Sequence, residues 1–219
     1  MSTLIENASL IFWDFDGVIK ESVSIKTDAY IKIFEPYGKN IQDLVKNHHE
    51  TNGGVSRFEK IPFYFKEYVG KSLTDNEAKS YYDKFSSLVL ELVINSSWVP
   101  GVNTYLKAKY KKQHFILVTG TPEDEINIIL KRLFLGVYFK KVFGAPMSKI
   151  EAVRISLDKF DIRPDKTIFI GDSSSDMEAA QVNNVPFLLR RTMKNKNLQK
   201  ICVTNCIDDF NNIGEQLCV

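Results

Sequence analysis

The chain has few of the features that mark secreted, membrane-bound or nucleic-acid-binding proteins. It contains 3 cysteines in 219 residues, too few and too odd in number for a disulfide framework. Its formal net charge is only +2 at pH 7, which gives no electrostatic argument for a nucleic-acid partner. No apolar run reaches the length of a membrane-spanning helix, and no signal peptide is apparent. We therefore expect a cytoplasmic protein with reduced thiols and with no membrane or nucleic-acid partner.

The chain does have a short apolar run that ends in paired acids. Residues 10–13 are followed at once by Asp14-Phe15-Asp16-Gly17. Side chains alternate along a strand, so Asp14 and Asp16 point to the same side while the strand conformation lasts. Two carboxylates that close together repel each other unless a cation or a shared proton relieves them. The pair indicates a Mg²⁺ site with one carboxylate free for nucleophilic attack, and an acidic turn after a strand is the alternative.

A second apolar run, at residues 166–170, carries the same kind of ending. It is followed by the sequence GDSSSD at 171–176, which leads into a predicted helix. Asp172 lies at the strand tip and Asp176 on the turn into the helix, where the helix dipole alone could also favour an acid. Ligands bind at the carboxyl ends of the strands in parallel α/β sheets. Asp172 and Asp14 are therefore expected to meet in one crevice.

A third predicted strand, at residues 115–118, ends in Thr119-Gly120-Thr121. The Thr119 hydroxyl is a candidate ligand for a phosphate oxygen, and Gly120 lets the backbone approach an anion closely. Thr121 precedes a proline and is predicted to be the N-cap of the next helix instead of a ligand. Lys149, at the start of a later helix, could balance the charge of the carboxylates and a phosphate, although a single lysine is more often solvated.

The order of the elements predicts an α/β fold with a helical insertion. Strands and helices alternate from residue 98 onward, which implies a parallel, doubly wound sheet. Residues 20–97 carry helical periodicity and no convincing strand, so we expect a Rossmann-like core of residues 1–19 and 98–219 and a helical cap of residues 20–97, with hinges at 19–24 and 95–100. The expected strands are 9–13, 115–118, 141–143, 167–170, 186–189 and about 201–203, and the expected helices include 27–37, 76–94, 102–111, 122–134, 150–160 and 175–183.

Taken in order, these motifs resemble the signature of the haloacid dehalogenase superfamily. DFDGV at 14–18, Thr119, Lys149 and GDSSSD at 171–176 are weak alone but specific as an ordered set after predicted strands. The resemblance covers nearly the whole chain. It is nearest to the phosphoglycolate phosphatase and β-phosphoglucomutase branch, in which a helical cap follows the first motif. One difference is Ile150, because relatives often have a proline after the lysine.

The resemblance implies a role for each motif residue. Asp14 would be the nucleophile that forms an aspartyl phosphate, and Asp16 would act as general acid and then general base. The implied phosphate-binding residues are Thr119, Gly120 and Lys149. The implied Mg²⁺ site consists of Asp14, the backbone carbonyl of Asp16, and Asp172, with Asp176 behind these ligands.

Substrate choice is expected to come from the helical cap, because the core chemistry treats any phosphoryl group alike. GVSR at 54–57 is similar to the cap loop of β-phosphoglucomutase-like relatives, whose arginine grips the anionic end of the substrate. Arg57 is therefore the predicted substrate-binding residue of the cap, with a surface arginine at a helix start as the alternative. His48 and His49 lack the spacing of a metal site and are expected to face solvent or substrate.

Three functions remain open on these observations. The first is a Mg²⁺-dependent phosphatase, monomeric or homodimeric, that acts on a small phosphorylated metabolite such as a sugar phosphate or phosphoglycolate. The second is a phosphomutase of the β-phosphoglucomutase type, in which the aspartyl phosphate survives for a second transfer. The third is a catalytically silent protein that binds a phosphosugar or a partner, which the presence of all four motifs argues against. Lys26 occupies a position where mutase relatives carry a residue that contacts Asp16, and a lysine there favours hydrolysis.

Overall fold

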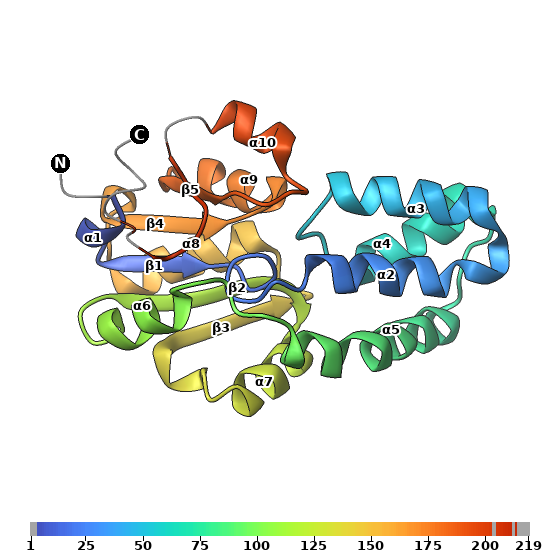
Figure 1. Ribbon diagram of the computed structural model, residues 1–219, viewed down its shortest axis with the longest axis horizontal. Helices are drawn as coiled ribbons and strands as arrows, with labels where there is room; N and C mark the ends of the chain where they lie inside the picture. The colour runs from blue at the N-terminus through green and yellow to red at the C-terminus, as the bar shows by residue number, and fades with distance from the viewer. Residues whose placement is uncertain (1–3, 203–204, 212, 214–219) are drawn as a thin grey trace.

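The computed structural model describes residues 4–202, 205–211 and 213, and its core is a parallel sheet flanked by helices (Figure 1). Six strands are hydrogen-bonded in the order β3-β2-β1-β4-β5-β6, and every neighbouring pair is parallel. The doubly wound α/β fold predicted from the alternation of strands and helices is therefore confirmed. The strands are β1 (Leu10–Trp13), β2 (His114–Pro122), β3 (Phe139–Ala145), β4 (Thr167–Gly171), β5 (Phe187–Arg190) and β6 (Cys206–Ile207).

The strand order creates a topological switch point beside β1. The chain moves outward from β1 to β2 and β3, and it then returns to the other side of β1 to form β4. In open α/β sheets, a crevice for ligands forms at such a point, outside the carboxyl ends of the strands. Because β1 ends at Trp13, the next residue, Asp14, lies at this crevice.

The side chains of β1 point alternately to the two faces of the sheet. Ile11 and Trp13 belong to the hydrophobic cluster on one face, Leu10 and Phe12 belong to the cluster on the other, and all four are fully buried. A period of two with burial on both sides is expected for a central strand covered by helices. The first cluster includes side chains of α6 (Val102–Lys109) and α7 (Glu123–Arg132), and the second includes side chains of α8 (Lys149–Phe160) and α9 (Ser174–Val182).

Residues 20–97 form a group of helices beyond the carboxyl ends of the strands (Figure 1). As the helical periodicity predicts, the only strand-like pairing described here consists of isolated bridges at Lys20. Aromatic side chains fill the interior, where the Phe34 ring lies 5.7 Å from Tyr64 and 4.9 Å from Phe65 between ring centres. The helices are α2 (Val23–Ile33), α3 (Lys39–Thr51), α4 (Arg57–Tyr64) and α5 (Asp75–Asn95), with short helical turns at Glu35–Tyr37 and Phe65–Val69.

The two connections between these helices and the sheet lie side by side. Lys20, in the first connection, is bridged to Trp98 in the second. The buried Nζ of Lys20 donates a hydrogen bond of 3.1 Å to the carbonyl of Ile94 and lies 4.3 Å from the centre of the Trp98 ring. A carbonyl and an aromatic face both stabilise an ammonium group. This lysine thus joins the two segments that the sequence predicts as hinges.

The first helix of this group is shifted relative to the prediction of residues 27–37. It begins earlier, at Val23, and ends at Ile33. Pro36 lies in the short helical turn that follows. A proline ring disfavours the α conformation of the residue before it, which explains why the helix does not continue.

Two further boundaries near the site and the carboxyl terminus differ from the prediction. Thr121 is not an N-cap, because β2 continues to Pro122 and α7 begins at Glu123 without a side-chain cap. The edge strand predicted over residues 201–203 is wrong: Ile201 is the last residue of α10 (Lys196–Ile201), β6 forms the sheet edge, and Val203 lies outside the described residues. No helix in the described chain has the length and apolar character needed to cross a membrane. The other helical segments are α1 (Leu4–Asn7), Gly136–Tyr138 and Pro164–Lys166.

Candidate active site

Three aspartates from the two ends of the sequence meet at the switch point. Asp14 follows β1, and its backbone N–H donates a 3.0 Å hydrogen bond to the carbonyl of Ile170 in β4. Asp172 directly follows β4, and Asp176 lies in the first turn of α9. Each of the three buried side chains offers a carboxylate oxygen, and these oxygens all lie within 4.8 Å of one another. The structure thus brings together the acids that the sequence predicts to share one crevice.

Gly17 allows the loop after β1 to pass close to this cluster. Its φ of +78° is a left-handed conformation that side chains with a Cβ rarely adopt. A Cβ built on Gly17 would also overlap the carboxylate of Asp172. The glycine of the DFDG motif therefore meets both a backbone requirement and a steric one.

Lys149 supplies the positive charge within the cluster. Its Nζ lies 2.6 Å from Oδ1 of Asp176 and 3.2 Å from Oδ2 of Asp14, and all three side chains are buried. Burial alone would lower the pKa of Lys149, but the charges of Asp14 and Asp176 raise it above its ordinary value. Lys149 is therefore a cation at every physiological pH. The alternative interpretation of Lys149 as a solvated surface lysine is therefore wrong.

Asp176 has both carboxylate oxygens engaged by the protein. Oδ1 accepts from Lys149, and Oδ2 accepts from the backbone N–H of Ser173 at 3.1 Å and from its hydroxyl at 2.5 Å. The two residues form a reciprocal capping box at the start of α9. This geometry makes Asp176 a support for Lys149 and for the helix start, while Asp14 and Asp172 have more freedom to accept a cation.

The negatively charged forms of Asp14 and Asp172 are disfavoured in this cluster. Burial, the main cause, together with the charge of Asp176 raises the pKa of Asp14 to about 7, against the opposing effect of Lys149. Burial and the charges of Asp14 and Asp176 raise the pKa of Asp172 well above its ordinary value. One lysine is thus too little positive charge for three buried carboxylates. A bound divalent cation would relieve this repulsion, and carboxylate oxygens suit a hard ion such as Mg²⁺.

We expect Asp172→Asn to stabilise the metal-free protein at neutral pH. The raised pKa of Asp172 means that the folded state binds more protons than the unfolded state once the pH exceeds the ordinary aspartate value. Asp172 therefore lowers the free energy of unfolding increasingly as the pH rises toward its folded-state pKa. Melting curves in EDTA should show a Tm several degrees above wild type near pH 7.5 and a smaller difference near pH 4.5.

The exposed Asp158→Asn variant is the matched control and should leave Tm unchanged. Addition of Mg²⁺ should raise the Tm of the wild type more than that of Asp172→Asn. A metal-free Asp172→Asn protein that melts below wild type at pH 7.5 would contradict this account of the cluster.

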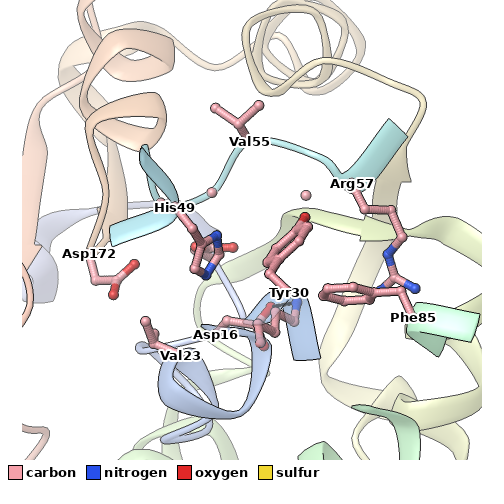
Figure 2. Close-up of a pocket in the computed structure, with 13 residues that line it drawn as sticks. Asp16, Val23, Tyr30, His49, Val55, Arg57, Phe85 and Asp172 are labelled. Carbon is pink, nitrogen blue, oxygen red and sulfur yellow. Dashed lines mark hydrogen bonds and ion pairs between the residues drawn. The ribbon is translucent and has the colours of Figure 1, made fainter. Parts of the chain in front are cut away.

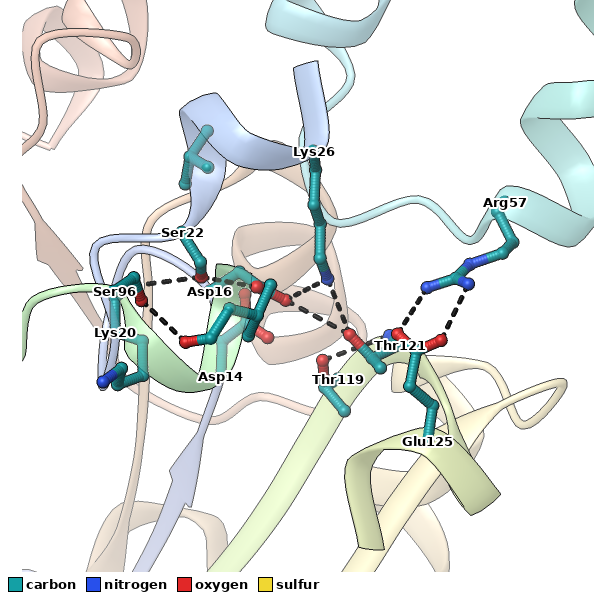
Figure 3. A network of polar contacts seen from close by, with 12 residues as sticks. Asp14, Asp16, Lys20, Ser22, Lys26, Arg57, Ser96, Thr119, Thr121 and Glu125 are labelled. Carbon is teal, nitrogen blue, oxygen red and sulfur yellow. Dashed lines mark hydrogen bonds and ion pairs between the residues drawn. The ribbon is translucent and has the colours of Figure 1, made fainter. Parts of the chain in front are cut away.

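Asp16 is held in a separate polar network that reaches into the helices of residues 20–97 (Figure 3). The hydroxyl of Ser22 donates to Oδ1 of Asp16 at 2.6 Å, and Thr121 donates to Oδ2 at 3.2 Å. Lys26, from α2, forms an ion pair with Oδ2 and also donates to the Thr121 hydroxyl at 2.6 Å. Burial would raise the pKa of Asp16, but the charge and hydrogen bond of Lys26 lower it. Thr121 thus contacts a predicted catalytic residue instead of capping α7.

The three predicted phosphate-binding residues lie around one cavity beside the cluster. Thr119, Gly120 and Lys149 all line it. The buried Thr119 hydroxyl accepts a 3.2 Å hydrogen bond from the backbone N–H of Thr121. Gly120 packs against the loop of residues 52–56 so closely that a Cβ there would overlap the carbonyl of Gly54. Glycine is therefore required at this position by the close approach of a second backbone.

Arg57 does not present a free guanidinium to the site in this structure. Its NH1 and NH2 groups donate to the two carboxylate oxygens of Glu125 at 2.8 and 2.6 Å, and NH1 also donates to Ser86 at 2.6 Å. Both members of the ion pair are buried, at 3% and 7% exposure. Figure 3 shows this pair joining the helical group to α7 of the core. Glu125 has no signal in the sequence beyond its place in the first turn of a helix.

Further contacts close the helical group over the core. The hydroxyl of Ser175 donates to the carbonyl of Gly53 at 3.3 Å. Ion pairs also join Glu50 to Lys194 and Glu91 to Arg132. A cavity of about 60 Å³ lies between the two parts, lined by Asp14 and Asp172 on one side and by Tyr30 and His49 on the other (Figure 2).

Asn195 is a site residue that the sequence does not reveal. Its side-chain amide donates to the carbonyls of Asp172 and Arg190, at 2.8 Å each. It thereby ties the loop after β4 to the loop after β5. A lone asparagine in a polar stretch carries no motif, so only the tertiary contact identifies it.

The parallel, doubly wound sheet with buried aspartates beyond the carboxyl ends of β1 and β4 places the chain among α/β proteins with an acidic site at the switch point. The chain belongs to the haloacid dehalogenase-like hydrolase family, whose model matches residues 11–189. It is a phosphoric monoester hydrolase, as this family and its similar relatives indicate. The resemblance inferred from the four motifs is thereby confirmed.

Individual relatives agree with this assignment. The chain is 32% identical over 182 residues to a phosphoglycolate phosphatase of Mannheimia succiniciproducens, which covers 78% of this chain and 80% of the relative. It is 29% identical over 178 residues to a phosphorylated carbohydrates phosphatase of Thermotoga maritima, which covers 78% of this chain and 79% of the relative. Among solved structures, β-phosphoglucomutase of Clostridium difficile shares the fold with a TM-score of 0.74 at 20% identity, over 94% of this chain and 93% of that chain.

Proposed function

We propose that this protein is a Mg²⁺-dependent phosphatase that hydrolyses a small phosphorylated metabolite, of the phosphoglycolate or sugar phosphate type, through an aspartyl phosphate on Asp14. One observation carries the proposal: Asp14 lies in a buried cluster with Asp172, Asp176 and a charged Lys149 at the switch point. The relatives named as phosphatases of phosphoglycolate and of phosphorylated carbohydrates support the substrate class.

The residues present fit a divalent cation. Asp14 and Asp172 would hold it together with the backbone carbonyl of Asp16, since burial and the neighbouring carboxylates raise the pKa of both groups and only one lysine faces the three acids. When bound, the ion supplies charge neutralisation for the phosphoryl oxygens and for the attacking carboxylate.

The side chains of the site divide the work of a two-step hydrolysis. Asp14 attacks phosphorus and displaces the alcohol, which forms the aspartyl phosphate. Lys149, the Thr119 hydroxyl and the backbone N–H of Gly120 neutralise the phosphoryl oxygens, because an anionic nucleophile and an anionic ester otherwise repel each other. Water then cleaves the acyl phosphate and regenerates Asp14.

Asp16 would move the protons of both steps. Its lowered pKa leaves it ionised in the arrangement described here, which suits a base that deprotonates water in the second step. As an acid in the first step it must take up a proton, and the negative charge of a bound phosphate favours that uptake. Ser22, Lys26 and Thr121 hold the carboxylate in position for both roles.

The helices of residues 20–97 would act as a cap that closes over the substrate and excludes water. The proposed cap consists of this segment, and the core consists of residues 1–19 and 98–219. Its hinges would be residues 19–24 and 95–100, which lie side by side. The cross-contacts of Arg57 with Glu125 and of Lys26 with Asp16 correspond to the closed arrangement.

We expect the purified protein to release phosphate from p-nitrophenyl phosphate and from members of a metabolite ester panel when Mg²⁺ is present. EDTA should lower kcat/KM on the order of 10³-fold, because loss of several kcal/mol of charge stabilisation corresponds to such a factor. Excess Mg²⁺ should restore the rate. Undiminished hydrolysis in EDTA would exclude the metal requirement, and no hydrolysis of any ester would exclude the phosphatase.

The same reactions followed by ³¹P NMR distinguish the mutase alternative. A phosphatase gives inorganic phosphate in proportion to the ester consumed. A phosphomutase gives an isomerised sugar phosphate and little inorganic phosphate. The contact between Lys26 and Asp16 is the feature of this chain that favours hydrolysis.

A further inference from the structure

A buried lysine of the helical group has a histidine as its hydrogen-bonding partner. Lys60, in α4, is 2% exposed, and its Nζ lies 2.9 Å from Nδ1 of His49 in α3. Its Nζ is also 5.8 Å from the centre of the Tyr30 ring. Within residues 4–202, 205–211 and 213, no carboxylate oxygen lies within the 4.0 Å of an ion pair with Lys60.

Three other cations near the aspartates are already paired with carboxylates. Lys149 is paired with Asp14 and Asp176. Lys26 is paired with Asp16, and Arg57 is paired with Glu125. Lys60, behind the cavity residue His49, is thus a buried lysine that finds no carboxylate within ion-pair distance among the described residues.

The absence of a carboxylate partner is unfavourable for Lys60 in the ligand-free protein. Burial, reinforced by the charges of Lys26 and Lys149, lowers the pKa of Lys60 to about 7. Removing an ammonium group from water costs several kcal/mol unless an opposite charge compensates. An anion placed in the neighbouring cavity would supply that compensation.

His49 connects Lys60 to the cavity. Protonated Lys60 has hydrogen-bond donors only, so in that state Nδ1 of His49 accepts from it and the imidazole proton resides on Nε2. Burial and the nearby lysines keep the pKa of His49 well below its ordinary value, so the ring is neutral. None of the described residues accepts a hydrogen bond from Nε2.

The His49 ring and the reacting carboxylate border the same space. His49 lines the cavity together with Asp14, Asp16 and Tyr30. In Figure 2 the ring projects among the lining side chains, in the view between Asp172 and Tyr30. The centres of the His49 and Tyr30 rings are 4.7 Å apart, and the ring planes are tilted by 47°. A ligand whose phosphate lies at Asp14 thus has its other end within this cavity.

We propose that His49, oriented by the positioning residue Lys60, binds a second anionic group of the substrate. The preferred substrates would then be compact phosphate esters that carry a carboxylate or a second phosphate besides the reacting phosphate. This inference rests on the proposed function, because it requires the reacting phosphate to lie at Asp14.

Three esters built on one two-carbon frame test the proposal with the full chain and Mg²⁺. They are 2-phosphoglycolate, ethanediol bisphosphate and the neutral-ended 2-hydroxyethyl phosphate. Wild type should show a kcat/KM for 2-phosphoglycolate about 10–100-fold above that for 2-hydroxyethyl phosphate, as expected for a charge-assisted hydrogen bond. Lys60→Met and His49→Gln should each reduce this ratio about 10-fold or more, mainly through the KM of the charged ester. Lys60→Arg should retain part of the ratio.

Lys66→Met is the matched control, because Lys66 is an exposed lysine of the same helical group. It should leave the ratio unchanged. A bisphosphate preferred over 2-phosphoglycolate, and sensitive to Lys60→Met, would support the subsite and identify the second group as a phosphate. An equal loss for the charged and the neutral ester in a folded Lys60→Met protein would overturn the proposal and leave the phosphatase function intact.

Binding to an Asp14→Asn protein, measured by calorimetry, separates failure of the subsite from failure of the proposed function. In this protein the Kd for 2-phosphoglycolate should be at least about 10-fold below that for 2-hydroxyethyl phosphate. Loss of this difference in the Asp14→Asn, Lys60→Met double variant would support the subsite even without turnover. Equal Kd values for the two esters would overturn it, whether or not the wild type hydrolyses them.

Discussion

Asp14→Asn is expected to lower kcat/KM for every phosphate ester on the order of 10⁴–10⁶-fold, the scale seen when a covalent nucleophile is removed. An amide oxygen is a poor nucleophile, and asparagine also removes one negative charge from the proposed metal site. Steady-state hydrolysis of p-nitrophenyl phosphate, with wild type at matched Mg²⁺, measures the loss. Mass spectrometry of acid-quenched protein should find a phosphoryl group on the Asp14 peptide of the wild type and none on the variant.

Unfolding cannot explain such a loss, because the same substitution should not destabilise the protein. The pKa of Asp14 is raised to about 7 chiefly by burial, so asparagine removes an unfavourable buried charge. The Tm of Asp14→Asn in EDTA should equal or exceed that of wild type. The exposed Asp158→Asn variant should retain full activity. Substantial turnover by Asp14→Asn would refute the nucleophile assignment.

Asp16→Asn is expected to lower kcat for alkyl phosphates about 10²–10⁴-fold, the usual contribution of general acid–base catalysis. The single amide oxygen of asparagine can accept from Lys26 and Thr121, and its NH2 group can donate to the Ser22 hydroxyl, so the contacts of this network can persist while proton transfer is lost. The first step with p-nitrophenyl phosphate should suffer less, because its leaving group departs without protonation. Rapid mixing should therefore show a burst of nitrophenol followed by slow turnover.

The burst is what separates a proton-transfer role from a structural one. Phosphorylated Asp14 should accumulate in the Asp16→Asn protein, because no base activates the water of the second step. Asp28→Asn, an exposed substitution in the neighbouring helix α2, serves as control and should show wild-type rates. Equal losses for aryl and alkyl esters without phosphoenzyme would indicate that Asp16 only supports the local structure.

The meeting of Asp14 and Asp172 could be predicted because it follows from local rules. Each residue comes directly after a short apolar run, and parallel strands bring their carboxyl ends to one edge of the sheet. The pairing of β1 with β4 places the two strand ends next to each other. The prediction therefore needed only the identity of the strands and the right-handed, parallel connections that such chains form.

Thr121 and the last strand were less predictable, because competing local signals favour another structure. A threonine followed by proline is a typical helix start, yet β2 extends through both residues, and Thr121 contacts Asp16 instead. Near the carboxyl terminus, β6 has only two residues, Cys206 and Ile207. An element that short has too little periodicity to be placed from sequence.

The charge pairing within the helical group depended on distances that sequence does not encode. The sequence motif around Arg57 predicts an anion-binding residue. In the structure, however, the carboxylate of Glu125, 68 positions away in the chain, accepts hydrogen bonds from both NH groups of Arg57. Lys60 and His49 carry no motif, and their burial together follows from how α3 and α4 pack. Whether a cation is solvated, paired or available to a ligand is decided only by its three-dimensional neighbours.

The sequence by itself determined the first five strands and the helices between them, the family, and the acids at the strand tips, since these depend on periodicity and on residues that are contiguous in the chain. The tertiary structure alone decided that Arg57 pairs with Glu125, and it set the distances and burial at which Lys149 meets Asp14 and Asp176 and at which Lys26 meets Asp16. The physical reason is that electrostatic interaction depends on separation and burial in space. Residues far apart in the sequence acquire both only when the chain has folded.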